Sequence, residues 1–258
     1  MIETLDLKAL HVEAMRLENL HAEHDPGVLF QASTIDALLD GAYEGQISFA
    51  ELSAHGDCGL GTLDALDGEM IALDGRFYRA DLDGRINEIG PDALTPFAVI
   101  GWLAPGIKFR VDHLMSQSTV LAEADDHLPA GSPSCLIRID GEFESIKARS
   151  VPRQEPPFRP LAEVVADQHV FDMPRISGTM IGFRFPAYAE GIEVAGYHLH
   201  FIDTDRTRGG HVLDFEITRG NIVLDPSSDL HVELPPGIDL TSPTLSSGTH
   251  AAIERIER

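Results

Sequence analysis

Three histidines lie close together in the second half of the chain, at a spacing that could bind one metal ion. In the segment 196–203, GYHLHFID, a strand would point His198 and His200 to one side and the apolar residues between and around them to the other. The polar segment 203–210 indicates a loop, after which His211 opens a second strand. Antiparallel pairing about this loop brings His211 opposite Leu199 or His200. The sequence therefore predicts a hairpin that presents three imidazoles on one face.

Three neutral imidazoles are suitable ligands for Zn²⁺, and also for Fe²⁺, Mn²⁺ or Cu²⁺. In catalytic zinc sites three protein ligands leave a position for water or substrate, whereas a structural site would be closed by a fourth Cys or His. The alternative is that these are ordinary surface or core histidines, because a chain with 12 histidines contains His-x-His by chance. The third histidine at the start of the returning strand favours a metal site.

Three Asp-Gly steps predict a β-meander in the first half of the chain. They are Asp67-Gly68, Asp74-Gly75 and Asp83-Gly84, and such steps between apolar runs are a strong hairpin signal. Glu69 follows the first step among apolar neighbours, where an acid is usually a solvated strand residue. The glycines in segment 56–61 lack the strand-to-helix context of a dinucleotide site, so nucleotide binding is not favoured.

Helices are expected mainly in the first half. Apolar residues at helical spacing predict an amphipathic helix over residues 4–21, and Ser33-Thr34 could cap a short helix over residues 35–39. Residues 111–124 also have a helical pattern, and a short helix is expected within 161–166.

Residues 135–151 alternate in polarity and predict a strand, or a hairpin that turns near Asp140-Gly141. Lys147 and Arg149 fall on one face of this segment and give the acidic chain a local basic spot. Spacing alone favours a solvated strand edge for both. The proline-rich segment 151–160 is the best candidate for a boundary between two halves. Beyond it the chain is nearly all strand and turn, which indicates a small antiparallel barrel or sandwich.

Composition and charge narrow the classes of partner. The chain has 258 residues, and 19 Lys and Arg against 42 Asp and Glu give a formal net charge of −23. This charge would repel phosphate backbones and anionic membranes, so neither nucleic acid nor a membrane is an expected partner. Cys58 and Cys135 are far apart and fit buried thiols in a reducing compartment. The chain has no apolar run long enough to span a bilayer, and its amino terminus is unlike a signal peptide, so a cytoplasmic location is expected.

Several sequence blocks together resemble the α-acetolactate decarboxylase family, from about Leu29 to the carboxyl end. The blocks occur in the family's order: LFQASTIDALLDGAYEG, HGDCGLGTLDALDGEMIALDGRFY, TPFAVI, GEFESIKARSVPRQ and GYHLHFIDTDRTRGGHVLDF. The combination is far more specific than any one block. The resemblance implies a zinc enzyme that converts (S)-2-acetolactate to (R)-acetoin and CO₂ and works as a homodimer.

The resemblance also implies a fold and a set of site residues. The fold would be α+β, with a mixed β-sheet domain with flanking helices over residues 29–155 and a small antiparallel β-barrel domain over 156–258. The helical extension expected over residues 1–28 lies outside the resemblance. The barrel would carry the metal hairpin, and its C-terminal tail would return to the site. The zinc ligands would be His198, His200 and His211. The catalytic residues would be Glu69, Arg149 and Glu257, with Glu254, one turn from Glu257, as the alternative.

The chemistry of that reaction agrees with these residue types. Loss of CO₂ leaves an electron pair on the carbon that carried the carboxylate, and a Lewis acid at the ketone oxygen spreads this charge into an enediolate. Neutral histidines preserve the positive charge of the metal, and Arg149 would orient the carboxylate as a planar fork. Glu69 or Glu257, with its pKa moved toward neutrality, would then protonate one face. No organic cofactor is required.

Two other classes of function remain open from the residues. A cupin-like metal enzyme, such as a dioxygenase or an isomerase, also uses His-x-His with a later histidine on strands. Such enzymes usually have a glutamate a few residues after His-x-His, whereas Asp203 and Asp205 follow here at a different spacing. The third class is a non-catalytic β protein that binds a metal or a sugar.

Overall fold

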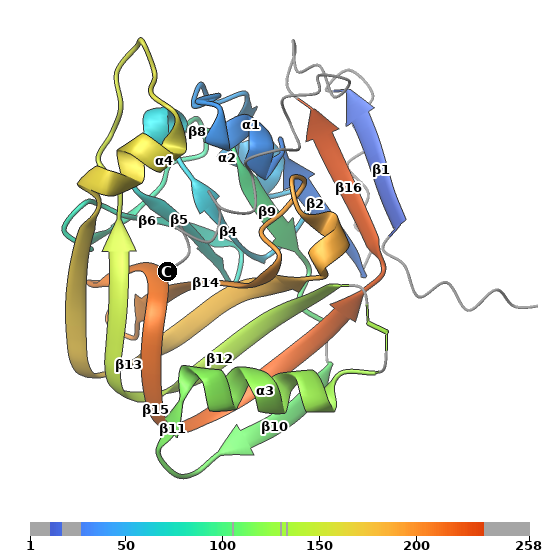
Figure 1. The fold of residues 1–258 in the computed structure, drawn as a ribbon, viewed down its shortest axis with the longest axis vertical. Helices are drawn as coiled ribbons and strands as arrows, with labels where there is room; N and C mark the ends of the chain where they lie inside the picture. The colour runs from blue at the N-terminus through green and yellow to red at the C-terminus, as the bar shows by residue number, and fades with distance from the viewer. Residues whose placement is uncertain (1–10, 17–26, 105, 130, 133, 235–258) are drawn as a thin grey trace, which may run out of the picture.

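A computed structural model describes residues 11–16, 27–104, 106–129, 131–132 and 134–234. It is mostly β-sheet with few helices, and two sheets, one of eight and one of six strands, lie one above the other in Figure 1. A two-stranded sheet of β3 (Ile47–Ser48) and β8 (Leu94–Thr95) is separate from both. Among the described residues, no helix combines the length and the apolar character needed to cross a membrane.

The first sheet is mixed. Its strands, in the order in which they pair, are β1 (His11–Arg16), β16 (Asp229–Leu234), β2 (Val28–Ala32), β9 (Ala98–Gly101), β4 (Cys58–Thr62), β5 (Glu69–Leu73), β6 (Arg76–Ala80) and β7 (Ile86–Glu88). β16 pairs parallel with both β1 and β2, and the remaining pairs are antiparallel. The predicted meander is confirmed by β4 to β7. Asp74 (φ 53°) and Gly75 (φ 75°) form its two-residue turn, where both residues need the left-handed conformation.

The predicted amino-terminal helix is wrong over residues 11–16, which form the edge strand β1 beside β16 (Figure 1). In the segment HVEAMR, the apolar residues Val12 and Ala14 are two positions apart, which is the spacing of a strand. The local pattern is therefore compatible with a strand as well as with a helix. Pairing with β16, which is distant in the sequence, selects the strand. The rest of the predicted helix lies in segments 1–10 and 17–26, outside the described residues.

The second sheet is antiparallel. Its strands are β10 (Ile107–Val111), β15 (Gly209–Ser227), β12 (Ser134–Ser150), β13 (His169–Phe185) and β14 (Gly196–Asp203), and the short β11 (Met115–Ser116) also pairs with β15. β14 pairs with both β13 and β15, and β12 also pairs with both, so the pairing of β12, β13, β14 and β15 runs in a ring.

The alternative of a hairpin at Asp140-Gly141 is wrong, because β12 continues through it as one strand. Gly141 pairs with Gly178 on one side and Gly220 on the other. A Cβ added at Gly141 would lie 2.8 Å from Cδ1 of Ile217, in the core. Glycine is therefore needed for close packing here and does not mark a turn.

The sheets do not divide at the predicted boundary between residues 155 and 156. β10 and β12 precede this boundary and pair with β15, which follows it, and β16 belongs to the first sheet. One core cluster joins the sheets, with Leu60 and Val99 from the first and Ile181 and Phe183 from the second. Pairing between strands that are distant in the sequence therefore joins the segments on the two sides of the proline-rich segment 151–160.

Short helices flank the sheets. They are α1 (Ile35–Leu39), α2 (Phe49–Leu52), α3 (Gln117–His127) and α4 (Leu161–Val164), with 3₁₀ turns at Asp64–Leu66, Val165–Asp167 and Ala187–Ala189. The predicted cap of α1 is confirmed, because the Thr34 side chain accepts a hydrogen bond from the Ala37 amide. The helix expected over 111–124 begins only at Gln117, since the residues before it pair with β15 as β10 and β11.

A buried carboxyl on β16 predicts a pH-dependent stability. Glu233 is 3% exposed, and its Oε2 has no hydrogen-bond partner among the described residues. Burial, and then the nearby Glu51, raises the pKa of Glu233 from its ordinary 4.5 to about 7. The folded chain therefore holds this proton more tightly than the unfolded chain, and the stabilisation is lost as the pH rises from 4.5 to 7.

Between pH 5 and pH 8, the free energy of unfolding should therefore fall by about 2 kcal/mol more in the native chain than in Glu233→Gln. Urea unfolding of both proteins at the two pH values measures this difference, and the effects of the other acids cancel in the comparison. Parallel pH dependence of the two proteins would contradict the prediction.

Candidate metal centre

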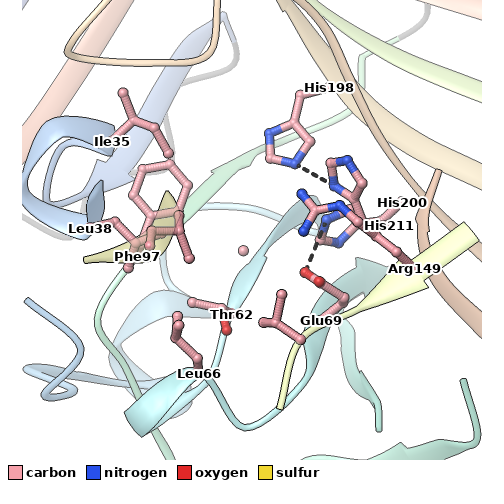
Figure 2. A pocket seen from close by; sticks show the side chains of 13 residues that line it. Ile35, Leu38, Thr62, Leu66, Glu69, Phe97, Arg149, His198, His200 and His211 are labelled. Atoms are coloured by element: carbon pink, nitrogen blue, oxygen red, sulfur yellow. Dashed lines mark hydrogen bonds and ion pairs between the residues drawn. The ribbon is translucent and has the colours of Figure 1, made fainter. Parts of the chain in front are cut away.

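The three histidines converge on one point, as the predicted hairpin required. His198 and His200 lie on the same face of β14, and His200 pairs directly with His211 on β15. One ring nitrogen from each lies within 4.8 Å of the others, and the side chains are buried. Nε2 of His198 and Nδ1 of His211 are 3.2 Å apart. The β-hairpin thus forms a three-nitrogen cradle (Figure 2).

The first sheet fixes the ring of His200. Its Nδ1 donates a hydrogen bond of 2.8 Å to the backbone oxygen of Met70 on β5. This contact places the proton on Nδ1 and leaves the lone pair of Nε2 directed at the cradle, where Nε2 has no hydrogen-bond partner among the residues that the structure describes. A backbone carbonyl that orients a histidine in this way is a common outer contact of metal ligands.

Burial, aided by nearby positive charge, keeps the three imidazoles neutral. Burial, and then the charge of Arg149, lowers the pKa of His198 to about 3. Burial is also the largest cause that lowers the pKa of His200 and of His211 well below the ordinary value. A metal ion needs neutral imidazole, so no proton has to leave before binding at neutral pH.

The donor set of the cradle, and the spacing of one pair of its nitrogens, fit a first-row divalent metal ion such as zinc. Two imidazole nitrogens that bind one zinc ion at 2.0–2.1 Å would be about 3.3 Å apart, close to the 3.2 Å between His198 and His211. The donor set of three neutral nitrogens suits zinc and other first-row divalent metals. The residues present therefore fit a metal ion.

Glu69 lies beside the cradle and is not a solvated strand residue. It is the first residue of β5 and is 7% exposed. Its Oε2 is 3.6 Å from Nε2 of His200. Figure 2 shows the carboxylate pointing toward the histidines from the first sheet, while the histidines come from the second. A carboxylate at this position can accept or donate a proton inside the cavity.

Arg149 is also buried, contrary to the solvated edge that its spacing favoured. It lies near the end of β12, opposite His211 on β15, and is 4% exposed, whereas Lys147 on the same face is exposed. The spacing of Lys147 and Arg149 could not reveal this difference in burial. It arises because the end of β12 that carries Arg149 lies where the two sheets meet. The guanidinium brings a permanent positive charge to the cavity.

One cavity contains these five polar residues and an apolar wall. The other residues that line it are Ile35, Leu38, Gly61, Thr62, Leu66, Phe97, Val151 and Leu161. In Figure 2, Ile35, Leu38 and Phe97 lie across the cavity from the histidines. Sequence reasoning missed this wall, because apolar residues carry no chemical signature. For Leu66, the sequence offered only the predicted turn at Asp67-Gly68, which follows it directly.

The structure does not describe two of the expected site residues. Glu254 and Glu257 fall within 235–258, outside the described residues. Asp203, which follows His-x-His, accepts hydrogen bonds from the Thr207 amide and hydroxyl and from the Arg208 amide, at 2.6, 2.7 and 2.9 Å. Asp203 therefore closes the loop between β14 and β15, and its carboxylate is engaged there.

Comparisons with known proteins agree on one family. The family model described as Alpha-acetolactate decarboxylase matches residues 29–246. A protein of that name from Methanosarcina mazei is 43% identical over 235 residues, which cover 90% of this chain and 80% of the relative. Another from Klebsiella aerogenes is 40% identical over 242 residues, 93% of each chain. The crystal structure of alpha-acetolactate decarboxylase from Bacillus subtilis strain 168 superposes with a TM-score of 0.85 at 36% identity, covering 89% of this chain and 99% of that one.

Proposed function

Because this chain belongs to the α-acetolactate decarboxylase family, we propose that it converts (S)-2-acetolactate to (R)-acetoin and CO₂ with Zn²⁺ bound by His198, His200 and His211. The substrate loses its carboxylate as CO₂, and one proton takes its place on the same carbon. The observation that supports this most strongly is that three neutral imidazoles, a buried guanidinium and a buried carboxylate meet in one cavity.

The bound zinc would supply a Lewis acid for the negative charge that remains when CO₂ departs. His198, His200 and His211 would hold it without reducing its positive charge, because all three are neutral. Met70 keeps His200 in the required tautomer through its backbone oxygen. The first sheet thus contributes to the metal site although the ligands are on the second.

Arg149 would bind the carboxylate of the substrate. The chain carries a net charge of −23, which opposes the capture of an anion, so a buried cation in the cavity is needed. A guanidinium donates two parallel hydrogen bonds to a carboxylate and thereby fixes its plane. This orientation would align the breaking C–C bond for loss of CO₂.

Glu69 or Glu257 would donate the proton. The position of Glu69 beside His200 and its burial support Glu69. If Glu69 is the donor, Glu69→Gln should lower kcat by roughly 10²- to 10⁴-fold and release acetoin of mixed configuration, since protonation by water would not select a face. Chiral chromatography of the product tests this. Glu88→Gln, an exposed residue on β7, is the matched control, and unchanged (R)-acetoin from Glu69→Gln would assign the donor to Glu257 or its neighbour Glu254.

We propose that the ring of β12, β13, β14 and β15 is the small barrel, and that the C-terminal tail returns to the site. We further propose a cytoplasmic homodimer. Analytical ultracentrifugation, with a mass near twice 28.1 kDa as the expected result, tests the dimer.

Metal analysis combined with a product assay tests the proposed function. The purified protein should contain about one zinc per chain and release CO₂ and acetoin from racemic acetolactate. Removal of the metal by a chelator should abolish turnover, and zinc should restore it. Fully active metal-free protein would overturn the proposal. A metal-dependent dioxygenase would lose activity both without its metal and without dioxygen. Equal rates in air and under nitrogen would therefore support a decarboxylase over a dioxygenase.

A further inference from the structure

The turn between β4 and β5 has an unfavourable backbone conformation beside the metal centre. Ala65 (φ 59°, ψ 29°) and Leu66 (φ 55°) are consecutive residues in the left-handed region. Residues with a Cβ rarely adopt this region, and a bulky residue such as leucine does so least readily. Such a conformation persists only when the surrounding contacts impose it, and these positions often have a functional role.

Contacts from three separate segments impose this conformation. The Ala65 amide donates to the backbone oxygen of Tyr43, and the Gln154 amide donates to the backbone oxygen of Ala65, both at 2.8 Å. Arg79 on β6 donates to the backbone oxygen of Asp67 at 2.7 Å and to its carboxylate at 2.6 Å. The turn is therefore held rigidly between the strand that begins with Glu69 and the segment that follows Arg149.

The consequence of this conformation is the position of Leu66. Its side chain is 1% exposed and lines the cavity that contains the three histidines, Glu69 and Arg149. In Figure 2, Leu66 lies on the apolar side, near Thr62 and across the cavity from the histidines. A substrate that contacts the polar groups would direct its alkyl groups at this wall.

We propose that Leu66 is a specificity-determining residue that limits the size of the alkyl group on the substrate. The inference rests on the proposed function and names the substrate class as 2-alkyl-2-hydroxy-3-oxo acids with short alkyl groups. Leu66 is suited to this role because its turn cannot yield without breaking the hydrogen bonds of Ala65 and Asp67. A more flexible wall would accommodate longer chains.

The test compares kcat/KM for 2-acetolactate with kcat/KM for two longer acids. One carries propyl in place of methyl at carbon 2, and the other is extended by two methylenes at the acyl end. Leu66→Ala removes three carbons from the wall and should raise the relative kcat/KM for at least one longer acid about tenfold. Leu60→Ala is the matched control, because Leu60 is a fully buried leucine on the adjacent β4 that does not line the cavity.

Leu66→Gly provides a second variant if Leu66→Ala folds poorly, because glycine adopts positive φ without steric cost. It should produce the same relaxation. An unchanged ratio for both longer acids in the folded Leu66 variants, or an equal change in Leu60→Ala, would overturn the inference. If the native protein releases no CO₂ from any of these acids, the proposed function itself fails, and this result is distinct from an unchanged ratio.

Discussion

Replacing His200 with alanine is expected to remove both the bound metal and the release of CO₂ from 2-acetolactate. His200 is 1% exposed and is oriented by the Met70 carbonyl on the first sheet, so its ring nitrogen is held in place at the cradle. Two remaining imidazoles bind zinc far more weakly than three, because a ligand and its orienting contact are both lost. We expect turnover to fall by roughly 10³-fold or more.

Elemental analysis of dialysed protein and the CO₂ assay measure the two losses. His113→Ala is the matched control, since the His113 side chain is 73% exposed at the turn after β10. It should retain the metal and full activity. If His200→Ala keeps one zinc per chain and turns over normally, the metal centre is assigned to the wrong residues.

Replacing Arg149 with alanine should leave the metal in place and nearly abolish turnover. The guanidinium is on β12, is buried between the sheets and is not among the three residues that form the nitrogen cradle. Its proposed role is to bind and orient the carboxylate, and loss of such an oriented charge costs roughly 10²- to 10⁴-fold in kcat/KM. Metal content and turnover should therefore separate in this variant, in contrast to His200→Ala.

Two further variants define the role of Arg149. Arg149→Lys keeps the charge but loses the planar fork, so activity should be intermediate. Lys147→Ala removes an exposed cation two residues away on the same strand face and should have no effect. Loss of metal in Arg149→Ala, with turnover restored by added zinc, would instead indicate a role in metal retention.

The sequence predicted the features that depend on local patterns. The period-two spacing of His198 and His200 and the polar loop before His211 were sufficient to predict the hairpin. The Asp-Gly step at residues 74–75 was sufficient to predict a turn. Each of these features is determined by a few neighbouring residues and their backbone preferences.

The features that the sequence did not predict depend on distant segments. Residues 11–16 form a strand because β16 pairs with them, and β12 passes through Asp140-Gly141 because strands on both sides bind its backbone. Arg149 is buried only where two sheets meet. The cavity wall that includes Leu66 is assembled from segments with no shared pattern. These outcomes follow from tertiary pairing, which overrides local preference.

The position of β16 inside the first sheet, next to the edge strand β1, has a consequence for folding during synthesis. Residues 229–234 insert between β1 and β2, which are near the other end of the chain, so a ribosome has released almost all of the described residues before this strand can enter. Until then the backbone edge of β2 is unpaired and open to association with other chains. The first sheet therefore matures late, and nascent chains that stop before Asp229 should be the species that aggregate and require chaperones.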